Sequence, residues 1–458
     1  MGTFVRSTSF EQPRSELARW HLQSTALLRL VPAWSGVRVV TLPPRLEDDA
    51  LVELDVPIPP FRRKLWRSLI EEVSENGFYD VQESGPFKSW RHHHQLLERE
   101  GDTSRLEDSV SYRFKEPWPL SVIGTRILEA GLIRTFNWRH QRTTNDLRRH
   151  HETGWSSRRV LVTGSSGLVG SALCAFLETG GWEVRRLVRR TPDPAASEFA
   201  WDPRAGTIDH AALEGVDAVV HLAGAGVADK RWSQARMKLI RDSRVDSTRL
   251  LSEAIASLGD SAPVLVCASA VGYYGNRPAD TVDERSEPGN GFLAETCVDW
   301  EAAAEPARSA GARVVNLRIG VVVASGGGAV KKLRPVVLTG LGGPVGSGRQ
   351  GMGWIALDDL LAIIQRSIID DRYQGPINAV SPKPIDNRAF MRTMGRVLRR
   401  PAFLPMPAPV VRMLFGRMGQ EALLDGAFVM PSRLNELEFR YDFPELDDAL
   451  HFELGVFR

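Results

Sequence analysis

Three glycines at a spacing of three residues carry the clearest chemical signal in the sequence. Gly164, Gly167 and Gly170 follow the apolar run RRVLVT and stand where a helical pattern begins. A first glycine there permits a tight turn, a second lets backbone approach a phosphate, and a third allows the helix to pack closely on the strand. The N–H groups that begin the helix then face the phosphate with a favourable dipole. The segment predicts a dinucleotide-binding turn formed by Gly164, Ser165, Ser166, Gly167, Leu168, Val169 and Gly170.

The choice of dinucleotide depends on the residues that end the next apolar run. Many NAD-binding folds place a carboxylate there for the ribose hydroxyls, whereas WEVRRLVRR ends in Arg189 and Arg190. A guanidinium binds a 2′-phosphate, which a carboxylate would repel. We therefore expect NADP(H) as the cofactor. NAD stays open because Asp193 follows shortly after, and two solvated surface arginines are the alternative interpretation.

Apolar runs that alternate with helical patterns must position this turn. From residue 158 onward these runs are RRVLVTG, WEVRRLV, DAVVHLAG, PVLVCASA and ARVVNLRIGVVV. Near-continuous runs of this kind are strands buried on both faces of a parallel sheet. The predicted fold class is an α/β Rossmann-type doubly wound parallel sheet at 158–400 with a small C-terminal substrate lobe at 401–458. The polar stretch 150–158 is the predicted linker to an α+β domain at 1–152, where short alternating runs such as VSYRF precede a helical stretch at 120–150.

Further motifs make residues 158–458 resemble the short-chain dehydrogenase/reductase superfamily, in particular its extended, sugar-nucleotide-epimerase-like branch. They are HLAG at 221–224, SAVGYYG at 269–275 and WIALDDL at 354–360. The resemblance implies that Leu222, Ala223 and Gly224 lie beside the cofactor. It implies an adenine contact for Asp202, although a plain loop aspartate is an equal alternative, and it places His221 at the strand end rather than in catalysis.

The acid/base pattern of that superfamily is missing. Its members use Tyr-x-x-x-Lys on one helix face, and none of the six tyrosines here has a lysine four residues later; Leu293 and Cys297 occupy the two positions. Counting back from Gly275 places the usual serine at Ala270, unless a one-residue insertion restores Ser269. The chain is therefore similar to an atypical, epimerase-like group with a C-terminal segment of DUF1731 type, matched by GGPVGSGRQGMGWI and RPAFLPMPAPVVRMLFG. Ala356 departs from that group, where relatives commonly have histidine.

Substitute chemistry would have to come from other residues. We predict Ser269, Tyr273 and Tyr274 as catalytic candidates, because all three follow or end the fifth strand at the cofactor end of the sheet. Arg349 and Gln350, in a glycine-rich loop, are predicted to bind a phosphate or carboxylate of the substrate. Further candidates are Lys230, Arg231, Arg244 and Arg318, and for each the alternative is surface charge or a structural hydrogen bond. Cys297 is expected to be a buried structural residue rather than a nucleophile.

Residues 1–152 resemble, through WHLQSTALLRLVPAW, GFYDVQESGPFKSWRHHH and the helical stretch, the helix-grip superfamily of START and Bet v 1 domains (SRPBCC). The resemblance implies a curved antiparallel sheet around a long C-terminal helix and an apolar ligand cavity. A metal site at His92, His93 and His94 is not expected. Only His92 and His94 share a strand face, and no acidic or thiol partner stands at ligand spacing.

Composition excludes several function classes. The net charge is +2 from 58 basic and 56 acidic residues, which gives no reason to expect a nucleic-acid partner. Three scattered cysteines fit a reducing compartment, and without an apolar leader or spanning segment we expect a cytoplasmic protein with no membrane partner. The leading hypothesis is an NADP(H)-dependent oxidoreductase or epimerase-like enzyme acting on a small molecule. The alternative is a non-catalytic sensor that binds NADP(H) and an apolar ligand.

Overall fold

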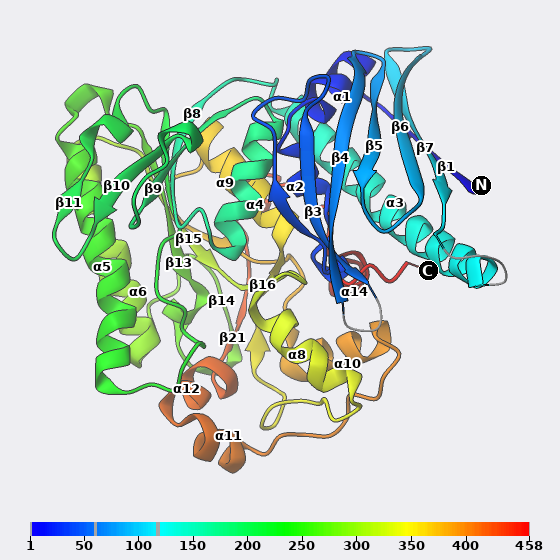
Figure 1. The fold of residues 1–458 in the computed structure, drawn as a ribbon. Helices are drawn as coiled ribbons and strands as arrows, with labels where there is room; N and C mark the ends of the chain where they lie inside the picture. The colour runs from blue at the N-terminus through cyan, green and yellow to red at the C-terminus, as the bar shows by residue number, and fades with distance from the viewer. Residues whose placement is uncertain (1, 59–61, 116–119, 458) are drawn as a thin grey trace. The chain divides into compact units, whose positions relative to one another are not determined.

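The computed structural model describes residues 2–58, 62–115 and 120–457, and the chain divides into two compact units. The first unit comprises residues 1–157, 175–182 and 454–458, and the second comprises 158–174 and 183–453. Among the described helices, none combines the length and apolar character that crossing a membrane requires. Each unit has its own sheet, and the two are described separately (Figure 1).

The first unit is a seven-stranded antiparallel sheet with one long helix. The strand order is β1-β7-β6-β5-β4-β3-β2. In β7 the burial alternates strictly along the strand, because successive side chains point to opposite faces and only one face is covered. The bounds are β1 (Gly2–Phe10), β2 (Arg38–Thr41), β3 (Leu51–Ile58), β4 (Arg62–Ser74), β5 (Gly77–Ser84), β6 (Ser89–Arg99), β7 (Thr103–Arg113), α1 (Arg14–His21), α2 (Ala26–Leu30) and α3 (Leu120–Glu152).

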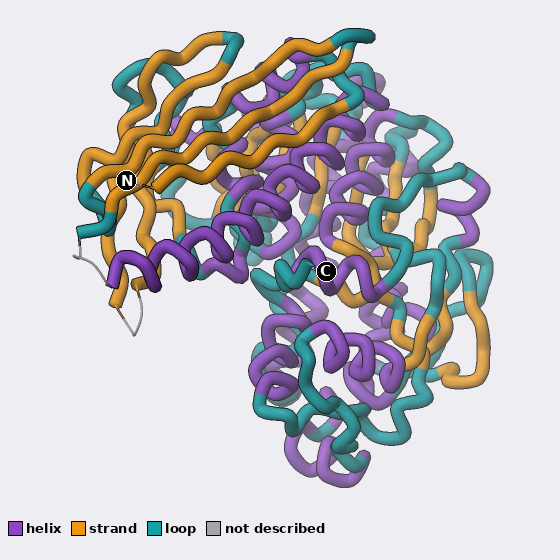
Figure 2. The backbone as a smooth tube through the Cα atoms, turned by 90° about the vertical axis from the view of Figure 1, so that its right-hand side faces the viewer, coloured by secondary structure: helices purple, strands orange, loops and turns teal. Residues whose placement is uncertain are grey.

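Helix α3 covers the buried face of that sheet (Figure 2). Its Leu132 and Phe136 join a cluster with Phe4 and Val110 of the sheet, and its Leu147 packs in a second cluster with Trp20. The antiparallel strand predicted at 110–114 and the helical stretch predicted at 120–150 are thereby confirmed as parts of β7 and α3.

The second unit contains the predicted doubly wound sheet. Its eight strands have the order β11-β10-β9-β8-β12-β13-β15-β19, and the register is parallel except between β10 and β11. The order reverses between β8 and β12, and in open α/β sheets ligands bind outside the carboxyl ends of the strands at such a reversal. The strands are β8 (Arg159–Thr163), β9 (Glu183–Val188), β10 (Glu198–Asp202), β11 (Thr207–Ile208), β12 (Ala218–His221), β13 (Val264–Ala270), β15 (Val314–Ile319) and β19 (Gly375–Ala379).

Helices cover both faces of this sheet, with α5 and α6 on one side and α4 and α9 on the other (Figure 1). Their bounds are α4 (Leu168–Thr179), α5 (Gln234–Ala256), α6 (Phe292–Ala302) and α9 (Leu357–Ile369). The remaining elements of the unit are α7 (Glu305–Ser309), α8 (Gly328–Leu338), α10 (Asn387–Val397), α11 (Ala408–Phe415), α12 (Arg417–Gly419), α13 (Ser432–Glu436), α14 (Leu446–Glu453), β14 (Arg277–Val282), β16 (Val321–Val323), β17 (Gly351–Met352), β18 (Trp354–Ala356), β20 (Ile385–Asp386) and β21 (Ala427–Val429).

One predicted strand is in fact two. The run ARVVNLRIGVVV divides at Gly320 into β15, which belongs to the main sheet, and β16, which pairs with β18 in a separate two-stranded sheet. A Cβ at Gly320 would lie 2.7 Å from the Gly353 carbonyl oxygen, so the backbones approach more closely there than a side chain would permit. The apolar run continues across the division, and the sequence pattern therefore gives no sign of it.

Candidate functional site

The glycine turn lies between β8 and α4 at the reversal of the strand order. Gly164 has a φ of +70°, and a Cβ there would stand 2.8 Å from the carbonyl carbon of Leu222. A Cβ at Gly170 would stand 2.2 Å from the Gly164 carbonyl oxygen. At Gly167, in contrast, an added Cβ would meet only that oxygen, at 3.2 Å. Gly164 and Gly170 are therefore required by internal packing, whereas Gly167 leaves room for a ligand beside the start of α4.

A buried chain of hydrogen bonds fixes the loop that faces this turn. Thr163 Oγ1 lies 2.7 Å from His221 Nδ1 and accepts the backbone N–H groups of Leu222 at 3.2 Å and Ala223 at 3.3 Å. On its other side, His221 Nε2 lies 3.0 Å from Ser247 Oγ. Burial lowers the pKa of His221 to about 3, so the ring is neutral and has a positioning role. The structure thus places Leu222 and Ala223 beside the glycine turn, and their contact with the cofactor stays a prediction.

The two arginines at the end of β9 differ in their surroundings. Arg190 forms two hydrogen bonds to the carboxylate of Glu198, at 2.7 and 2.5 Å. Arg189 is exposed, and its guanidinium has no hydrogen bond or ion pair within the described ranges of the chain. Asp193 is the residue whose carboxylate kept NAD as a possible cofactor in the sequence analysis. It accepts the backbone N–H of Ala195 in a short helical turn. Of the predicted pair, Arg189 has the guanidinium that is free to meet a 2′-phosphate.

Asp202 has a local structural role in the turn between β10 and β11. Its Oδ1 accepts the backbone N–H groups of Arg204 at 2.9 Å and Ala205 at 3.4 Å. An aspartate that bonds backbone two residues ahead is typical of such turns. The loop interpretation therefore explains this residue, and its adenine contact stays a prediction.

A buried network stands at the carboxyl ends of β13 and β15, where the superfamily's acid/base residues would be. Ser269 donates to Glu301 Oε1 at 2.7 Å, and Arg318 donates to both oxygens of the same carboxylate at 2.9 Å. Arg318 also donates to the Tyr274 hydroxyl at 3.0 Å, and that hydroxyl donates to Asn378 Oδ1 at 2.7 Å. Burial lowers the pKa of Arg318, and its bonds to Glu301 and Tyr274 more than reverse this, so the guanidinium stays charged.

This network changes the ranking of the predicted catalytic residues. Tyr274 has no exposed surface, and burial raises its pKa to about 12. Ser269 is 3% exposed and has its proton directed at Glu301. Both side chains are engaged within the network, so their contacts favour a structural role, and a catalytic role for Ser269 or Tyr274 stays a prediction. Tyr273 remains: it is half-buried, and the Arg318 guanidinium lies 3.4 Å from the centre of its ring.

Two further sequence candidates near the strand ends have structural roles. Cys297 is buried, and desolvation raises the pKa of its thiol to about 12, which agrees with the expected structural cysteine. Arg244 on α5 donates to the Ala225 and Ile240 carbonyl oxygens at 3.0 and 2.9 Å, and so holds the loop that follows Gly224.

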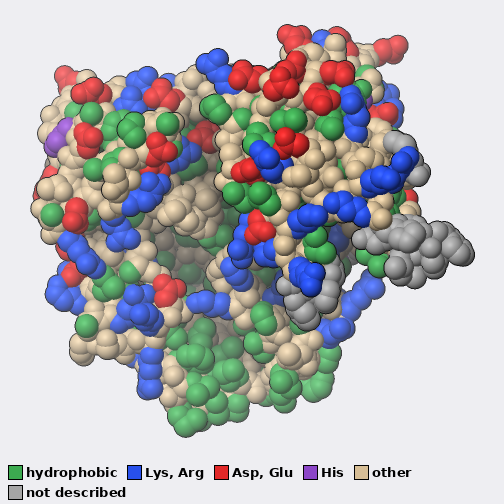
Figure 3. Space-filling model, in the orientation of Figure 1, with side chains coloured by type: hydrophobic (Ala, Val, Ile, Leu, Met, Phe, Trp, Pro, Cys, Tyr) green, Lys and Arg blue, Asp and Glu red, His purple; other side chains and the backbone are tan. Residues whose placement is uncertain are grey.

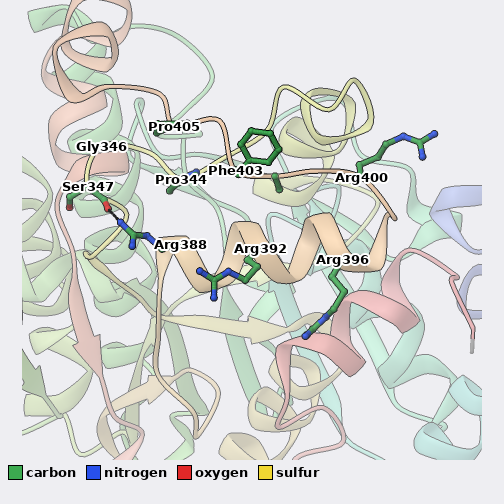
Figure 4. Close-up of a pocket in the computed structure, with 10 residues that line it drawn as sticks. Pro344, Gly346, Ser347, Arg388, Arg392, Arg396, Arg400, Phe403 and Pro405 are labelled. Carbon is green, nitrogen blue, oxygen red and sulfur yellow. Dashed lines mark hydrogen bonds between the residues drawn. The ribbon is translucent and has the colours of Figure 1, made fainter.

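The loop predicted to bind substrate borders a cavity of about 620 Å³ (Figure 4). Gln350 is buried and donates to the carbonyl oxygens of Val345 and Leu423, so it anchors the loop rather than facing a ligand. Arg349 is exposed and does not line the cavity. The lining residues are Pro344, Gly346, Ser347, Arg388, Arg392, Arg396, Arg400, Ala402, Phe403 and Pro405.

Four arginines give this cavity its charge. Arg388, Arg392 and Arg396 lie at spacings of four along α10 and therefore share one face of the helix. Arg388 donates to the Ser347 carbonyl oxygen at 3.0 Å, and Arg396 pairs with Asp447 at 2.7 Å. Arg392 lines the cavity and has no hydrogen bond or ion pair among the described residues, so its guanidinium has no counter-ion there. These arginines are not among the residues predicted from the sequence. Their repeat at every fourth residue of an amphipathic helix is the pattern that could have indicated a shared cationic face.

Apolar side chains gather on the surface next to the cavity, over α8 and α11 (Figure 3). Phe403, which lines the cavity, is 76% exposed. Other exposed members are Val336, Leu338, Leu341, Leu404, Met406, Val410, Met413 and Leu414. The cavity therefore has a cationic wall and an apolar border.

Comparison with known proteins agrees with this geometry. A model described as the NAD dependent epimerase/dehydratase family matches residues 160–372, and one described as a domain of unknown function, DUF1731, matches 406–452. An epimerase family protein of Mycobacterium bovis is 44% identical over 64% of this chain and 96% of its own length. A solved structure described as a nucleoside-diphosphate sugar epimerase from Corynebacterium glutamicum is 31% identical, with a TM-score of 0.81 over 99% of this chain and 90% of that one.

The human epimerase family protein SDR39U1, whose structure holds NADPH, is also similar. It is 34% identical over 65% of this chain and 100% of its own, with a TM-score of 0.59. Because the chain covers nearly all of relatives well above 30% identity, and because the glycine turn lies within the matched range, the chain belongs to the NAD dependent epimerase/dehydratase family, which uses a nicotinamide dinucleotide.

Proposed function

We propose that this protein is an NADP(H)-dependent oxidoreductase or epimerase that acts on a small anionic substrate. The observation that carries the cofactor choice is the exposed, unengaged guanidinium of Arg189 at the end of β9, beside a glycine turn that leaves space at Gly167. The NADPH in the human relative supports the same choice. The four arginines of the cavity support the substrate's charge, since guanidinium groups bind phosphate and carboxylate well.

Arg189→Gln is expected to weaken NADPH binding about 10- to 100-fold while leaving NADH binding nearly unchanged. The reason is that one or two charge-assisted hydrogen bonds to the 2′-phosphate, each worth about 1.5–3 kcal/mol, would be lost. Calorimetric titration of the full chain with both cofactors measures the effect. Arg190→Gln is the matched control and should have the smaller effect, because Glu198 already engages that guanidinium. Equal NADPH affinity in Arg189→Gln and in the unmodified protein would reject the proposed 2′-phosphate contact.

The substrate class is tested by a screen of carbonyl metabolites that follows NADPH oxidation. Phosphorylated and carboxylated compounds should be turned over in preference to neutral analogues, because Arg392 and Arg388 face the cavity. If only neutral compounds react, the arginine-lined cavity is not the substrate site. If no compound reacts while NADPH binds tightly, the enzyme proposal fails and the cofactor proposal survives.

Tyr273 is proposed as the proton donor to the substrate oxygen. A protonated phenol can serve as an acid near neutral pH but is a poor base, so carbonyl reduction should be faster than alcohol oxidation at pH 7. Once a substrate is known, Tyr273→Phe should lower kcat at least about tenfold, a modest part of a general-acid contribution. Tyr274→Phe is the comparison, and its effect should appear in stability rather than in kcat, because the hydroxyl it removes bonds Asn378. An unchanged kcat in Tyr273→Phe would show that another group donates the proton.

We also infer that residues 1–152 form a helix-grip, START/Bet v 1-like ligand-binding domain, followed by a dinucleotide-binding domain at 158–400 and a C-terminal segment at 401–458. The strand order, the two short helices α1 and α2 after the first strand, and the long α3 on the sheet support the inference. Native mass spectrometry of the freshly purified full chain tests it, with a co-purified apolar molecule as the expected result. No observation on the described residues favours the non-catalytic sensor over an enzyme.

A further inference from the structure

Two histidines and one aspartate converge inside the first unit. His92 and His94 lie on the same face of β6, and the antiparallel register places Asp108 of β7 directly opposite His94. All three are buried, with exposures of 2%, 8% and 2%. Their ligand atoms lie within 4.8 Å of one another. The acidic partner that the sequence spacing did not offer is therefore supplied by the neighbouring strand.

The distances around the carboxylate are those of a cluster with one shared centre. Asp108 Oδ1 lies 2.9 Å from His92 Nε2 and 2.9 Å from His94 Nδ1. Two ligand atoms at this separation subtend about 90° at an ion about 2.1 Å from each, which is the angle between adjacent ligands of an octahedron. Two imidazoles and one carboxylate on one side of such an ion form a set known to bind transition metals.

A second observation concerns the nitrogen of His94. His94 Nδ1 lies 2.9 Å from Asp108 Oδ1, but its direction falls outside ordinary hydrogen-bond geometry, so this contact is at best a poorly aligned hydrogen bond. A buried ring nitrogen without a hydrogen-bond partner is costly. His21 Nδ1 is in the same condition at 3% exposure, and the centre of its ring lies 6.1 Å from that of His94. A buried ring nitrogen whose contact to the carboxylate is poorly aligned is one that a cation bound in the histidine–aspartate cluster would satisfy.

We propose that His92 Nε2, His94 Nδ1 and Asp108 Oδ1 bind a divalent transition-metal ion such as Zn²⁺, Co²⁺ or Fe²⁺. These ions prefer imidazole and carboxylate ligands, in contrast to Mg²⁺ and Ca²⁺, which prefer oxygen alone. Three protein ligands leave positions open for water or for a further ligand.

His140 is a positioning residue for this site. Its Nε2 lies 2.7 Å from Asp108 Oδ2, and its Nδ1 lies 2.8 Å from Thr8 Oγ1. The contact to Oδ2 fixes the carboxylate so that Oδ1 faces the two imidazoles. Outer contacts of this kind orient metal ligands, and their loss typically weakens binding about 10- to 100-fold. The same hydrogen bonds could also hold the carboxylate without any metal, and the experiment separates these cases.

The test uses the full chain, purified without a histidine tag and stripped with a chelator. Titration with Co²⁺, followed by ligand-field absorption, and competition with Zn²⁺ give affinity and stoichiometry, with about one ion per chain expected. His94→Gln and Asp108→Asn should weaken binding at least tenfold, the lower bound of the outer-contact effect. His93→Gln is the matched control on the same strand. The His93 ring lies on the opposite face of the sheet, where it stacks on Tyr79 with 4.1 Å between the ring centroids. Its replacement should therefore not affect metal binding.

The Co²⁺ titration of the unmodified protein and of the variants has three distinguishable outcomes. A spectrum of nitrogen-ligated Co²⁺ in the unmodified protein that His94→Gln removes and His93→Gln retains supports the site. If the unmodified protein binds less than about 0.1 ion per chain, Asp108 is only a hydrogen-bond acceptor for histidines and the proposal is overturned. If His94→Gln binds Co²⁺ as well as the unmodified protein, the metal lies elsewhere. Circular dichroism checks that each variant folds. If His94→Gln does not fold, His140→Gln is measured in its place. Unchanged Co²⁺ affinity in both His140→Gln and Asp108→Asn would overturn the assignment.

Discussion

Gly167→Val is expected to lower NADPH affinity at least about 100-fold without unfolding the protein. An added Cβ meets only the Gly164 carbonyl oxygen, at 3.2 Å, which is a tight approach but a much smaller clash than at Gly164 or Gly170. The branched side chain would instead occupy the space beside the start of α4 where a pyrophosphate approaches backbone N–H groups. Loss of two charge-assisted hydrogen bonds, each worth about 1.5–3 kcal/mol, accounts for a factor of this size. Calorimetry with NADPH measures the affinity, and circular dichroism checks the fold.

Gly164 and Gly170 provide a comparison for this experiment, because backbone atoms occupy the space that a side chain at either position would need. Gly164→Val and Gly170→Val should lower the stability itself, since a Cβ at either position meets backbone atoms at 2.8 Å or less. Gly131→Val on α3 is the control for adding a branched residue, because a Cβ there meets nothing within 4 Å. Normal NADPH affinity in folded Gly167→Val would show that the cofactor binds away from this turn.

The features that sequence alone predicted correctly are the local ones. The glycine turn, the buried strands on either side of it and the long helix α3 depend on residue types within short windows, such as the apolar run before Thr163. Local pattern determines local backbone, and the doubly wound order follows from the alternation of strands and helices.

The features that sequence missed depend on contacts between side chains of different elements, which residue types within a short window do not specify. Glu198 engages Arg190 and leaves Arg189 free, yet nothing in the sequence near the arginines distinguishes them. Asp108 meets His94 only through the register of two antiparallel strands. The arginines of α10 could have been noticed by their spacing, but the cavity they line depends on the segment at 344–347 from elsewhere in the unit.

The buried network around Glu301 and Arg318 is the least predictable part of the site. In the sequence, Ser269 and Tyr274 stand where catalytic groups would be expected, and their types are compatible with proton transfer. Their actual partners, Glu301 and Arg318, come from α6 and β15. A serine and a tyrosine beside a buried ion pair become part of its hydrogen-bond shell. Their residue types therefore suit catalysis, whereas their contacts favour a structural role.

Glu301→Gln is accordingly expected to be a stability variant rather than a catalytic one. The side chains of Arg318 and Glu301 are 4% and 13% exposed, so the substitution leaves a buried guanidinium without its carboxylate. Breaking a buried ion pair on one side costs about 3–5 kcal/mol, whereas replacing both members by apolar groups of similar size is often nearly neutral. The double variant Glu301→Leu, Arg318→Met should therefore recover most of the stability lost in Glu301→Gln.

Denaturant unfolding of the full chain, followed by near-ultraviolet circular dichroism, measures these differences. Arg285→Gln is the matched control, because it removes one member of an exposed pair with Glu436, and such pairs contribute about 0–1 kcal/mol. A loss in Glu301→Gln no greater than in Arg285→Gln would mean that the buried network does not support the strand ends. If stability were unchanged and turnover with NADPH were abolished, Glu301 would instead be a catalytic residue, and the proton-donor role proposed for Tyr273 would have to be reassigned. The expected result is the opposite: reduced stability in Glu301→Gln, recovery in the double variant, and NADPH affinity that follows the folded fraction.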